Sequence, residues 1–144
     1  MVIVQEGMPA EARKIRQTVF IGEQGFVEEF DEVDDKALHV VTYEGQTPVG
    51  TARIFVDPDD QETYRIGRVA VLKTARKAGA GKRVMALAEA LIYAHGGKRV
   101  ALHAQAQAQG FYEKCGYRQE GPSFIEEDCP HVLMIKDLKY GGPA

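Results

Sequence analysis

The chain has 144 residues, 44% of them apolar or aromatic and 27% charged, which suits one folded domain with a buried core. Its net charge of -3 argues against binding of the whole surface to nucleic acid or to an anionic membrane. No apolar run approaches the roughly 18 to 20 residues of a membrane span, and the first residues lack the pattern of a signal peptide. We therefore expect a single cytoplasmic domain over 1–144, with no membrane segment.

The first quarter of the chain predicts a short strand, one helix and an acidic segment. Val2 to Val4 is a β-branched run. Pro9 opens a helix, because apolar residues there recur at three- and four-residue spacing. The apolar stripe of this helix is Met8, Ala12, Ile15 and Val19. From Gly22 to Asp35 the sequence is acidic and interrupted by glycine, which is typical of a solvated surface.

Beyond residue 35, apolar β-branched runs alternate with stretches of helical spacing. Glu44–Pro48 separates two strands of a predicted hairpin, and Asp57–Asp60 predicts a turn. The later strands enclose a helix from Gly79 to Gly96 and a short helix over 107–115. The strands predicted here are 38–43, 49–56, 64–72, 100–104 and 131–135, the last after a break at Cys129–Pro130. The pattern predicts a mixed α/β (α+β) protein.

Positive charge is concentrated between residues 65 and 83. This segment carries +7 and no acidic residue, whereas the rest of the chain carries −10. Its basic residues are Arg65, Arg68, Lys73, Arg76, Lys77, Lys82 and Arg83. The segment spans the end of a strand and a glycine-rich helix start, where unpaired N–H groups and the helix dipole favour phosphate. The sequence therefore predicts a pyrophosphate site.

Two familiar phosphate motifs do not fit this segment. A P-loop needs a glycine and a hydroxyl residue where Arg76 and Arg83 stand. A dinucleotide fingerprint needs a small residue where Val84 stands. A solvated basic loop is the remaining alternative, and seven basic residues without an acidic one favour a site over it.

Four motifs in order resemble the GCN-five-related N-acetyltransferases, the GNAT superfamily, and in particular its small bacterial ElaA-like branch. They are Ile66-Gly-Arg-Val-Ala-Val-Leu-Lys73, Arg76-Lys-Ala-Gly-Ala-Gly81, the strand 100–104 and Gly110-Phe-Tyr-Glu-Lys-Cys-Gly-Tyr117. The resemblance covers nearly the whole chain. It implies a central mixed sheet of six to seven strands, about four helices, and a splay between the two central parallel strands.

The resemblance also implies acetyl-CoA as co-substrate. Its pantetheine would pair with the main chain of 69–71, its pyrophosphate would lie on the N–H groups of 76–82, and Tyr112 would protonate the leaving thiolate. The residues implied in cofactor binding are Val69, Ala70, Val71, Arg76, Lys77, Ala78, Gly79, Ala80, Gly81, Lys82, Gln107, Phe111 and Tyr112. Without the resemblance, Tyr112 is an aromatic residue packed on a short helix.

The general base is not assigned by the sequence. Many relatives use a carboxylate on the central strand, but 65–68 contains no acid. An ammonium must lose a proton before it attacks a thioester, so another group or a water chain is required. The candidates are His131, His103, Asp31, Asp34 and Glu29, the last as base or as a contact to the acceptor. Each has a plain alternative, a structural histidine or a solvated acidic surface.

We therefore expect an enzyme that transfers the acetyl group of acetyl-CoA directly to an amine of a small molecule or peptide. A longer acyl group, or a CoA-binding module without catalysis, are the alternatives. Metal binding is not expected, because Cys115, Cys129 and His131 do not fall at zinc-ligand spacing. Nucleic acid is not an expected partner, and a homodimer stays open from the resemblance.

Overall fold

The computed structural model describes residues 2–26 and 30–138. Contacts divide the chain into two units. The first comprises Met1–Phe55 with Ile66–Ala88, and the second comprises Val56–Arg65 with Glu89–Ala144. The single domain expected over 1–144 stays a prediction. Within the described residues, no helix combines the length and apolar character needed to cross a membrane.

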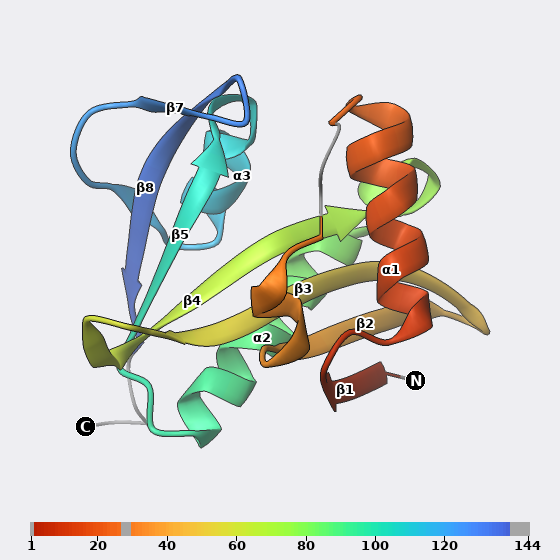
Figure 1. The fold of residues 1–144 in the computed structure, drawn as a ribbon, viewed down its shortest axis with the longest axis horizontal. Helices are drawn as coiled ribbons and strands as arrows, with labels where there is room; N and C mark the ends of the chain where they lie inside the picture. Colours follow the sequence, from red (N-terminus) through yellow and green to blue (C-terminus); the bar gives the residue numbers. More distant parts are fainter. Residues whose placement is uncertain (1, 27–29, 139–144) are drawn as a thin grey trace. The chain divides into compact units, whose positions relative to one another are not determined.

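Strands and helices alternate along the chain, which confirms the predicted mixed α/β class (Figure 1). The strands are β1 (Val2–Glu6), β2 (Leu38–Glu44), β3 (Thr47–Asp57), β4 (Asp60–Val71), β5 (Arg99–Gln105), β6 (Arg118–Gln119), β7 (Phe124–Glu126) and β8 (Cys129–Asp137). The helical segments are α1 (Ala10–Arg16), the π-helix η1 (Gln17–Glu23), α2 (Ala80–Ala94), α3 (Gln109–Lys114), and the 3-10 turns η2 (Glu32–Asp35), η3 (Lys73–Ala78) and η4 (Ala106–Ala108).

The strands form one mixed sheet in the order β1-β2-β3-β4-β5-β8-β6, with β7 paired to β8. The sheet has eight strands in the described part of the chain, rather than six to seven, because β6 and β7 are too short to show a periodic pattern. The predicted break at Cys129–Pro130 is wrong, since β8 begins at Cys129 and Pro130 pairs with Ile125. Proline is tolerated there because it lies at the start of the strand.

In the first unit the apolar stripe of α1 packs as the sequence predicts. Ala12, Ile15 and Val19 are buried together with Val41 of β2 and Ala70 of β4, and Met8 packs against this cluster. Beyond Arg16 the helix continues as the π-helix η1, which contains Val19. The end of β4 is therefore supported from one side by the first helical segment.

The parallel pairing of β4 with β5 is short. It joins Thr63, Tyr64 and Arg65 to Arg99, Val100 and Ala101, in that order. In the part of the chain that the structure describes, this ladder does not continue past Arg65, although β4 runs on to Val71. Three residues beyond Arg65, Arg68 has a φ of 52°, a left-handed conformation that is uncommon for a residue other than glycine. Such an irregularity is typical of a bulge that ends strand pairing.

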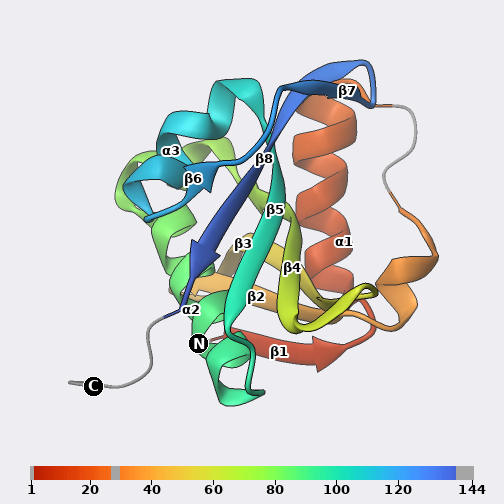
Figure 2. The ribbon, with the colours of Figure 1, turned by 90° about the vertical axis from the view of Figure 1, so that its left-hand side faces the viewer.

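In the second unit β8 pairs antiparallel with β5 along the whole length of β5, from Arg99 with Asp137 to Gln105 with His131. Figures 1 and 2 show α3 on one face of this pair and β7 curling onto the other face. Val100, Leu102 and Ala104 are buried, while His103 between them is exposed. The two faces of the β5–β8 pair therefore carry different side chains.

Gly50 of β3 allows α2 to approach the sheet of the first unit closely. A Cβ at Gly50 would lie 2.6 Å from Val84 Cγ2 and 2.7 Å from Thr42 Oγ1. We expect Gly50→Ala to lower the free energy of unfolding by about 1–3 kcal/mol, the usual cost of overpacking a filled core. Urea unfolding measures this, with Gly110→Ala as control, because a Cβ at Gly110 meets nothing within 4 Å. Equal stability of the two variants would contradict the close packing.

Candidate functional site

The basic segment of the first unit forms a helix start suited to anions. After the turn η3, Gly79 adopts φ 79°, and the first bond of α2 runs from the N–H of Arg83 to the carbonyl of Gly79, at 3.2 Å. An α-helix leaves the N–H groups of its first turn without intrahelical partners. Here these groups belong to residues 80–82. Together with the positive end of the helix dipole they form a place for a phosphate.

Arg76 holds this loop in place. Its Nε donates to the carbonyl of Val71 at 3.0 Å, and its Nη1 and Nη2 each donate to a carboxylate oxygen of Glu23 at 2.7 Å. The hydrogen bond from Arg76 lowers the pKa of Glu23, so the pair is charged at neutral pH. The charge of Arg76 is thus balanced within the protein. Lys77 and Lys82 on the same loop are exposed.

The predicted pantetheine strand, 69–71, lies at the end of β4. Ala70 is buried in the first unit's core, and the next residue, Leu72, donates its N–H to the carbonyl of Val49 at 2.8 Å. Arg68, with its left-handed backbone, directs its guanidinium toward Asp31 at 3.4 Å. The main chain of 69–71 is therefore fixed by the burial of Ala70, by the hydrogen bond of Leu72 and by the irregular backbone at Arg68.

The acidic segment contributes a buried ion network and not a free base. Asp34 is 3% exposed and accepts hydrogen bonds from Arg16 at 2.7 Å and from Arg53 at 3.0 Å. Burial raises the pKa of Asp34, but the hydrogen bonds from Arg16, the Asp31 N–H and Arg53 outweigh it and lower the pKa to about 2. Hydrogen bonds from Arg53 likewise lower the pKa of Asp31 against the opposing effect of burial. Both carboxylates are therefore poor proton acceptors.

Glu29, the third acidic candidate, lies outside the described residues. His39, which no pattern singled out, is fully buried beside the network. Its Nε2 lies 2.9 Å from the carbonyl of Asp34, and burial lowers the pKa of this imidazole. His39 therefore stays neutral and donates to that carbonyl, because a carbonyl oxygen only accepts.

In the second unit Tyr112 on α3 lies in an aromatic group. Its ring contacts the rings of Phe111 and Tyr117 edge-on, with centroids 5.0 and 6.0 Å apart. Burial raises the pKa of the Tyr112 phenol, so it stays protonated. Its hydroxyl makes no hydrogen bond with the residues the structure describes, whereas the hydroxyl of Tyr117 donates to Glu89 at 2.8 Å. Gln107 lies in η4, one turn before Tyr112, and donates to Gln105.

His131 and His103 lie together in the second unit. The Nδ1 of His131 is 2.8 Å from the carbonyl of Cys129, and its Nε2 is 3.8 Å from Oε2 of Glu126. The Nδ1 of His103 is 3.0 Å from Oε1 of the same glutamate. Phe124 stacks on His131 and meets His103 edge-on. Of the five candidate bases, these two are the ones that share a carboxylate neighbour and are not held by arginine.

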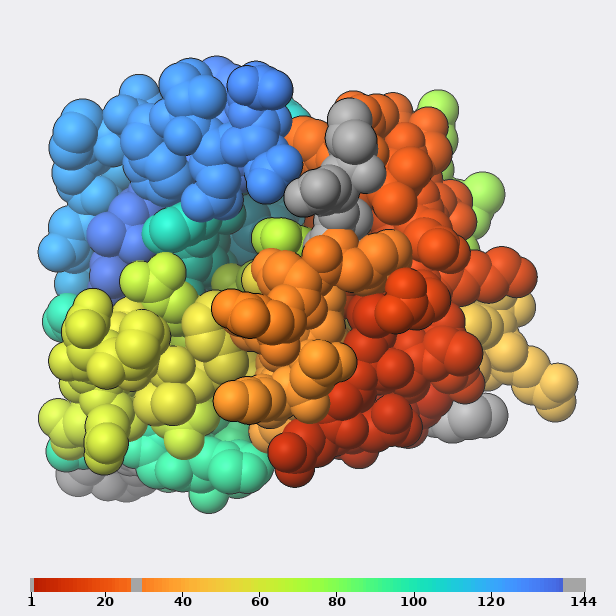
Figure 3. Space-filling model, in the orientation of Figure 1, coloured from red at the N-terminus to blue at the C-terminus, as the bar shows by residue number. Residues whose placement is uncertain are grey.

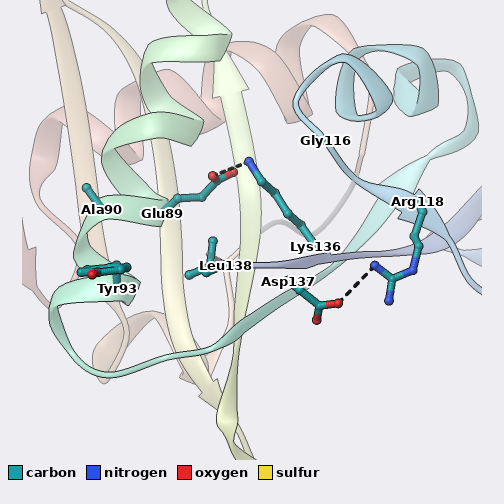
Figure 4. Close-up of a pocket in the computed structure, with 8 residues that line it drawn as sticks. All are labelled: Glu89, Ala90, Tyr93, Gly116, Arg118, Lys136, Asp137 and Leu138. Atoms are coloured by element: carbon teal, nitrogen blue, oxygen red, sulfur yellow. Dashed lines mark hydrogen bonds and ion pairs between the residues drawn. The ribbon is translucent and has the colours of Figure 1, made fainter. Parts of the chain in front are cut away.

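A separate hollow of about 730 Å³ lies in the second unit and contains none of the predicted site residues. Figure 4 shows that its walls are tied by ion pairs, from Lys136 to Glu89 at 2.7 Å and from Arg118 to Asp137 at 3.5 Å. Lys136 also donates to the carbonyl of Cys115 at 2.8 Å. These cations and anions satisfy one another, so the hollow presents little unbalanced charge to a ligand.

Comparison with known proteins assigns the family. A family model described as an acetyltransferase (GNAT) domain matches residues 5–138. The chain belongs to the GNAT acetyltransferase family. The match includes the basic loop, Tyr112 and both histidines, and it extends over both units. The resemblance predicted from four motifs is thereby confirmed.

Individual GNAT relatives agree with this assignment. The ElaA protein of Escherichia coli is 30% identical over 131 residues, which cover 87% of this chain and 84% of ElaA. Its crystal structure has a TM-score of 0.80 at 28% identity, over 94% of this chain and 99% of that one. A crystal structure of an N-acetyltransferase candidate from Lactobacillus plantarum has a TM-score of 0.87 at 32% identity, over 96% and 98%.

The same fold occurs in a Bacillus subtilis acetyltransferase whose crystal structure contains CoA. Its TM-score is 0.74 at 17% identity, and the match covers 96% of this chain and 98% of that one. At this identity the likeness concerns the fold. CoA is thus a ligand of an acetyltransferase with the same fold.

Two groups of side chains escaped the sequence analysis. Arg16 and Arg53, the partners of Asp34, lie on α1 and β3, and nothing in their local sequence marks them as buried. Glu126 lies two residues after Phe124 on β7, followed by a turn at Glu127 and Asp128 with φ of 53° and 57°. Such hairpin turns are usually marked by Asn or Gly. Alternation across this turn would have placed Phe124, Glu126 and His131 on one face.

The Asp34 network gives the first unit an acid-sensitive part of its stability. The pKa falls from 3.8 to about 2 on folding, so the carboxylate contributes about 2 kcal/mol above pH 4, which is lost as the pH falls through 2. We expect Asp34→Asn to cost about 3–5 kcal/mol at pH 7, because two guanidinium groups lose their buried partner. Urea unfolding between pH 7 and pH 3 measures both effects. The exposed Asp35→Asn is the control, and equal stabilities would contradict the network.

Proposed function

We propose that this GNAT protein transfers the acetyl group of acetyl-CoA to a primary amine. One observation carries the proposal: Gly79 ends the basic turn in a left-handed conformation and leaves the N–H groups of 80–82 at the start of α2. A pyrophosphate is the group that such a helix start and its exposed lysines would bind. Family membership and the CoA complex of a protein with the same fold support acetyl-CoA over a dinucleotide.

The cofactor-binding residues named from the sequence keep their roles in this proposal, with one refinement. Because Arg76 is paired to Glu23, its part is to hold the loop against the end of β4. Lys77 and Lys82 supply the charge that neutralises phosphate. The main chain of 69–71 pairs with the amides of pantetheine, as an exposed strand edge would.

The chemistry is direct transfer. A neutral amine attacks the thioester carbon, a C–N bond forms and the C–S bond breaks, and the amine gives up a proton as the thiolate leaves. Tyr112 is the proposed donor of a proton to that thiolate. Its buried phenol stays protonated, and its hydroxyl is not engaged by the described residues. A phenol in this condition is a suitable general acid.

A second candidate function is CoA binding without catalysis. It is favoured by the absence of an acid in 65–68, where many relatives place the base. A thiol-release assay over a panel of amines separates the two, because a binding module would release no CoA. Acetyl transfer is preferred, because His131 and His103 offer proton acceptors elsewhere in the chain.

The lysines of the basic loop are the first test. We expect Lys77→Ala/Lys82→Ala to raise the Kd for acetyl-CoA roughly tenfold at low salt and to flatten its salt dependence, because two charge-assisted contacts are lost. Isothermal titration calorimetry measures this. Lys14→Ala/Lys36→Ala, with the same net charge and exposed lysines in the same unit, is the control. A thermal shift with NAD equal to that with CoA would overturn the preference for CoA over a dinucleotide.

Tyr112 is the second test. Tyr112→Phe should lower kcat by about 10²-fold, the usual effect of losing a general acid, and leave the Kd for acetyl-CoA unchanged. Steady-state thiol release and calorimetry provide the two numbers. Tyr93→Phe, which removes a hydroxyl at a 41% exposed position, is the matched control. Unchanged kcat in the Tyr112 variant would remove this residue from the mechanism.

A further inference from the structure

The cluster of His103, His131, Glu126 and Phe124 lies on one face of the second unit. Residues opposite one another in an antiparallel ladder share a face, as do residues two apart on a strand. Gln105 pairs with His131, and His131 pairs with Phe124, so all four side chains point to the same side. This is the face onto which β7 curls, opposite α3 (Figures 1 and 2). The segment with β7, in blue, forms part of the surface there (Figure 3).

Hydrogen-bond partners indicate which tautomer each imidazole adopts when it is neutral. Nδ1 of His131 faces the carbonyl of Cys129, which only accepts, so Nδ1 carries the hydrogen and Nε2 carries the lone pair. Nδ1 of His103 likewise faces a carboxylate oxygen of Glu126. With neutral rings, the cluster therefore presents two Nε2 lone pairs and one carboxylate. It is rich in acceptors and carries a negative charge.

The spacing within the cluster calls for a donor. Nε2 of His131 and Oε2 of Glu126 are 3.8 Å apart, and both are acceptors when His131 is the neutral tautomer with its hydrogen on Nδ1. Neither can donate to the other, yet a single nitrogen with two N–H groups can reach both at ordinary hydrogen-bond lengths. His131 is only 6% exposed, so this acceptor lies in a largely buried side chain and gains strongly from a partner. A positively charged donor also compensates the charge of Glu126.

We propose that this cluster is the acceptor-amine site and that it binds a primary alkylammonium without a neighbouring carboxylate. Phe124, whose ring stacks on His131, offers apolar surface to an alkyl chain. Glu127 and Asp128, which follow Glu126 at the hairpin tip, disfavour a ligand carboxylate by charge repulsion. The inference rests on the proposed acetyl transfer for its biological meaning, although amine binding itself does not require acetyl-CoA.

The cluster also provides the proton step. The ammonium gives one proton to Nε2 of His131, which leaves a neutral amine and an imidazolium. The imidazolium then donates toward Oε2 of Glu126. Nε2 of His131 and Oε2 of Glu126, which were both acceptors before the transfer, thereby form an ion pair. The amine lone pair is free to attack a thioester. Glu126 is a binding residue in this scheme, and His131 is the proton acceptor.

The test is a titration of the protein without CoA by n-butylamine, followed through the Cε1–H signals of His131 and His103. We expect saturable shifts of both signals. 2-Aminopentanoate, which is n-butylamine with a carboxylate on the carbon that bears the amine, should bind at least tenfold more weakly, and n-butanol should cause no saturable shift. Glu126→Gln should raise the Kd for n-butylamine at least tenfold. Glu113→Gln on α3, which also removes one exposed charge, should leave it unchanged.

His131→Asn keeps a side-chain N–H where Nδ1 donates and removes the acceptor Nε2, so it should abolish CoA release with n-butylamine while the chain stays folded by circular dichroism. One outcome is that the wild type releases CoA at a rate that neither Glu126→Gln nor His131→Asn changes. That result would overturn the amine site and leave the proposed function standing. Amine binding that depends on Glu126 without CoA release from any amine would support the site and overturn the proposed function. Equal binding of n-butylamine and 2-aminopentanoate would overturn the stated substrate class.

Discussion

The first unit depends on the burial of one carboxylate. Asp34 accepts hydrogen bonds from Arg16 of α1 and Arg53 of β3, and it also accepts from the N–H of Asp31 at 3.0 Å. A buried charge without partners costs several kcal/mol, so these groups must come together in one arrangement. The helix, the acidic segment and the strand are thereby fixed to one another. The sequence predicted a solvated surface for this acidic segment, but Asp34 is buried and links α1 to β3 through its two arginine partners.

Ion pairs within the protein also balance much of the charge of the basic segment 65–83. Four of its seven basic residues are arginines with acidic neighbours. These pairs are Arg65 with Asp57, Arg68 with Asp31, Arg76 with Glu23 and Arg83 with Glu44. The excess of positive charge seen in the sequence is therefore partly balanced by acids outside the segment. What remains for a ligand is the set of lysines and the first N–H groups of α2. A compact anion such as a pyrophosphate suits this remainder better than an extended polyanion would.

The second unit uses the two faces of the β5–β8 pair for different tasks. On one face α3 carries Tyr112 in an aromatic group that keeps its phenol protonated. On the other face two imidazoles share Glu126. The proposed proton donor and the candidate proton acceptors thus lie on opposite faces of the same strands. The alternation of side chains along β5 and β8 sets which strand residues face α3 and which face the imidazoles.

The sequence by itself determined the local features: the stripe of α1, the strands of the hairpin, the glycine-rich helix start and the family. These are properties of neighbouring residues, so periodicity and motif spacing suffice to predict them. The tertiary structure alone decided which charges remain available. Arg76 and Glu23 are 53 positions apart, Arg53 and Asp34 are 19 apart, and His103 and Glu126 are 23 apart. The turn at Glu127 and Asp128 carries neither glycine nor asparagine, so nothing local predicted that β7 would fold back and bring one carboxylate to two histidines. The identity of a proton acceptor depends on such distant partners, which is why the family was legible in the sequence and the base was not.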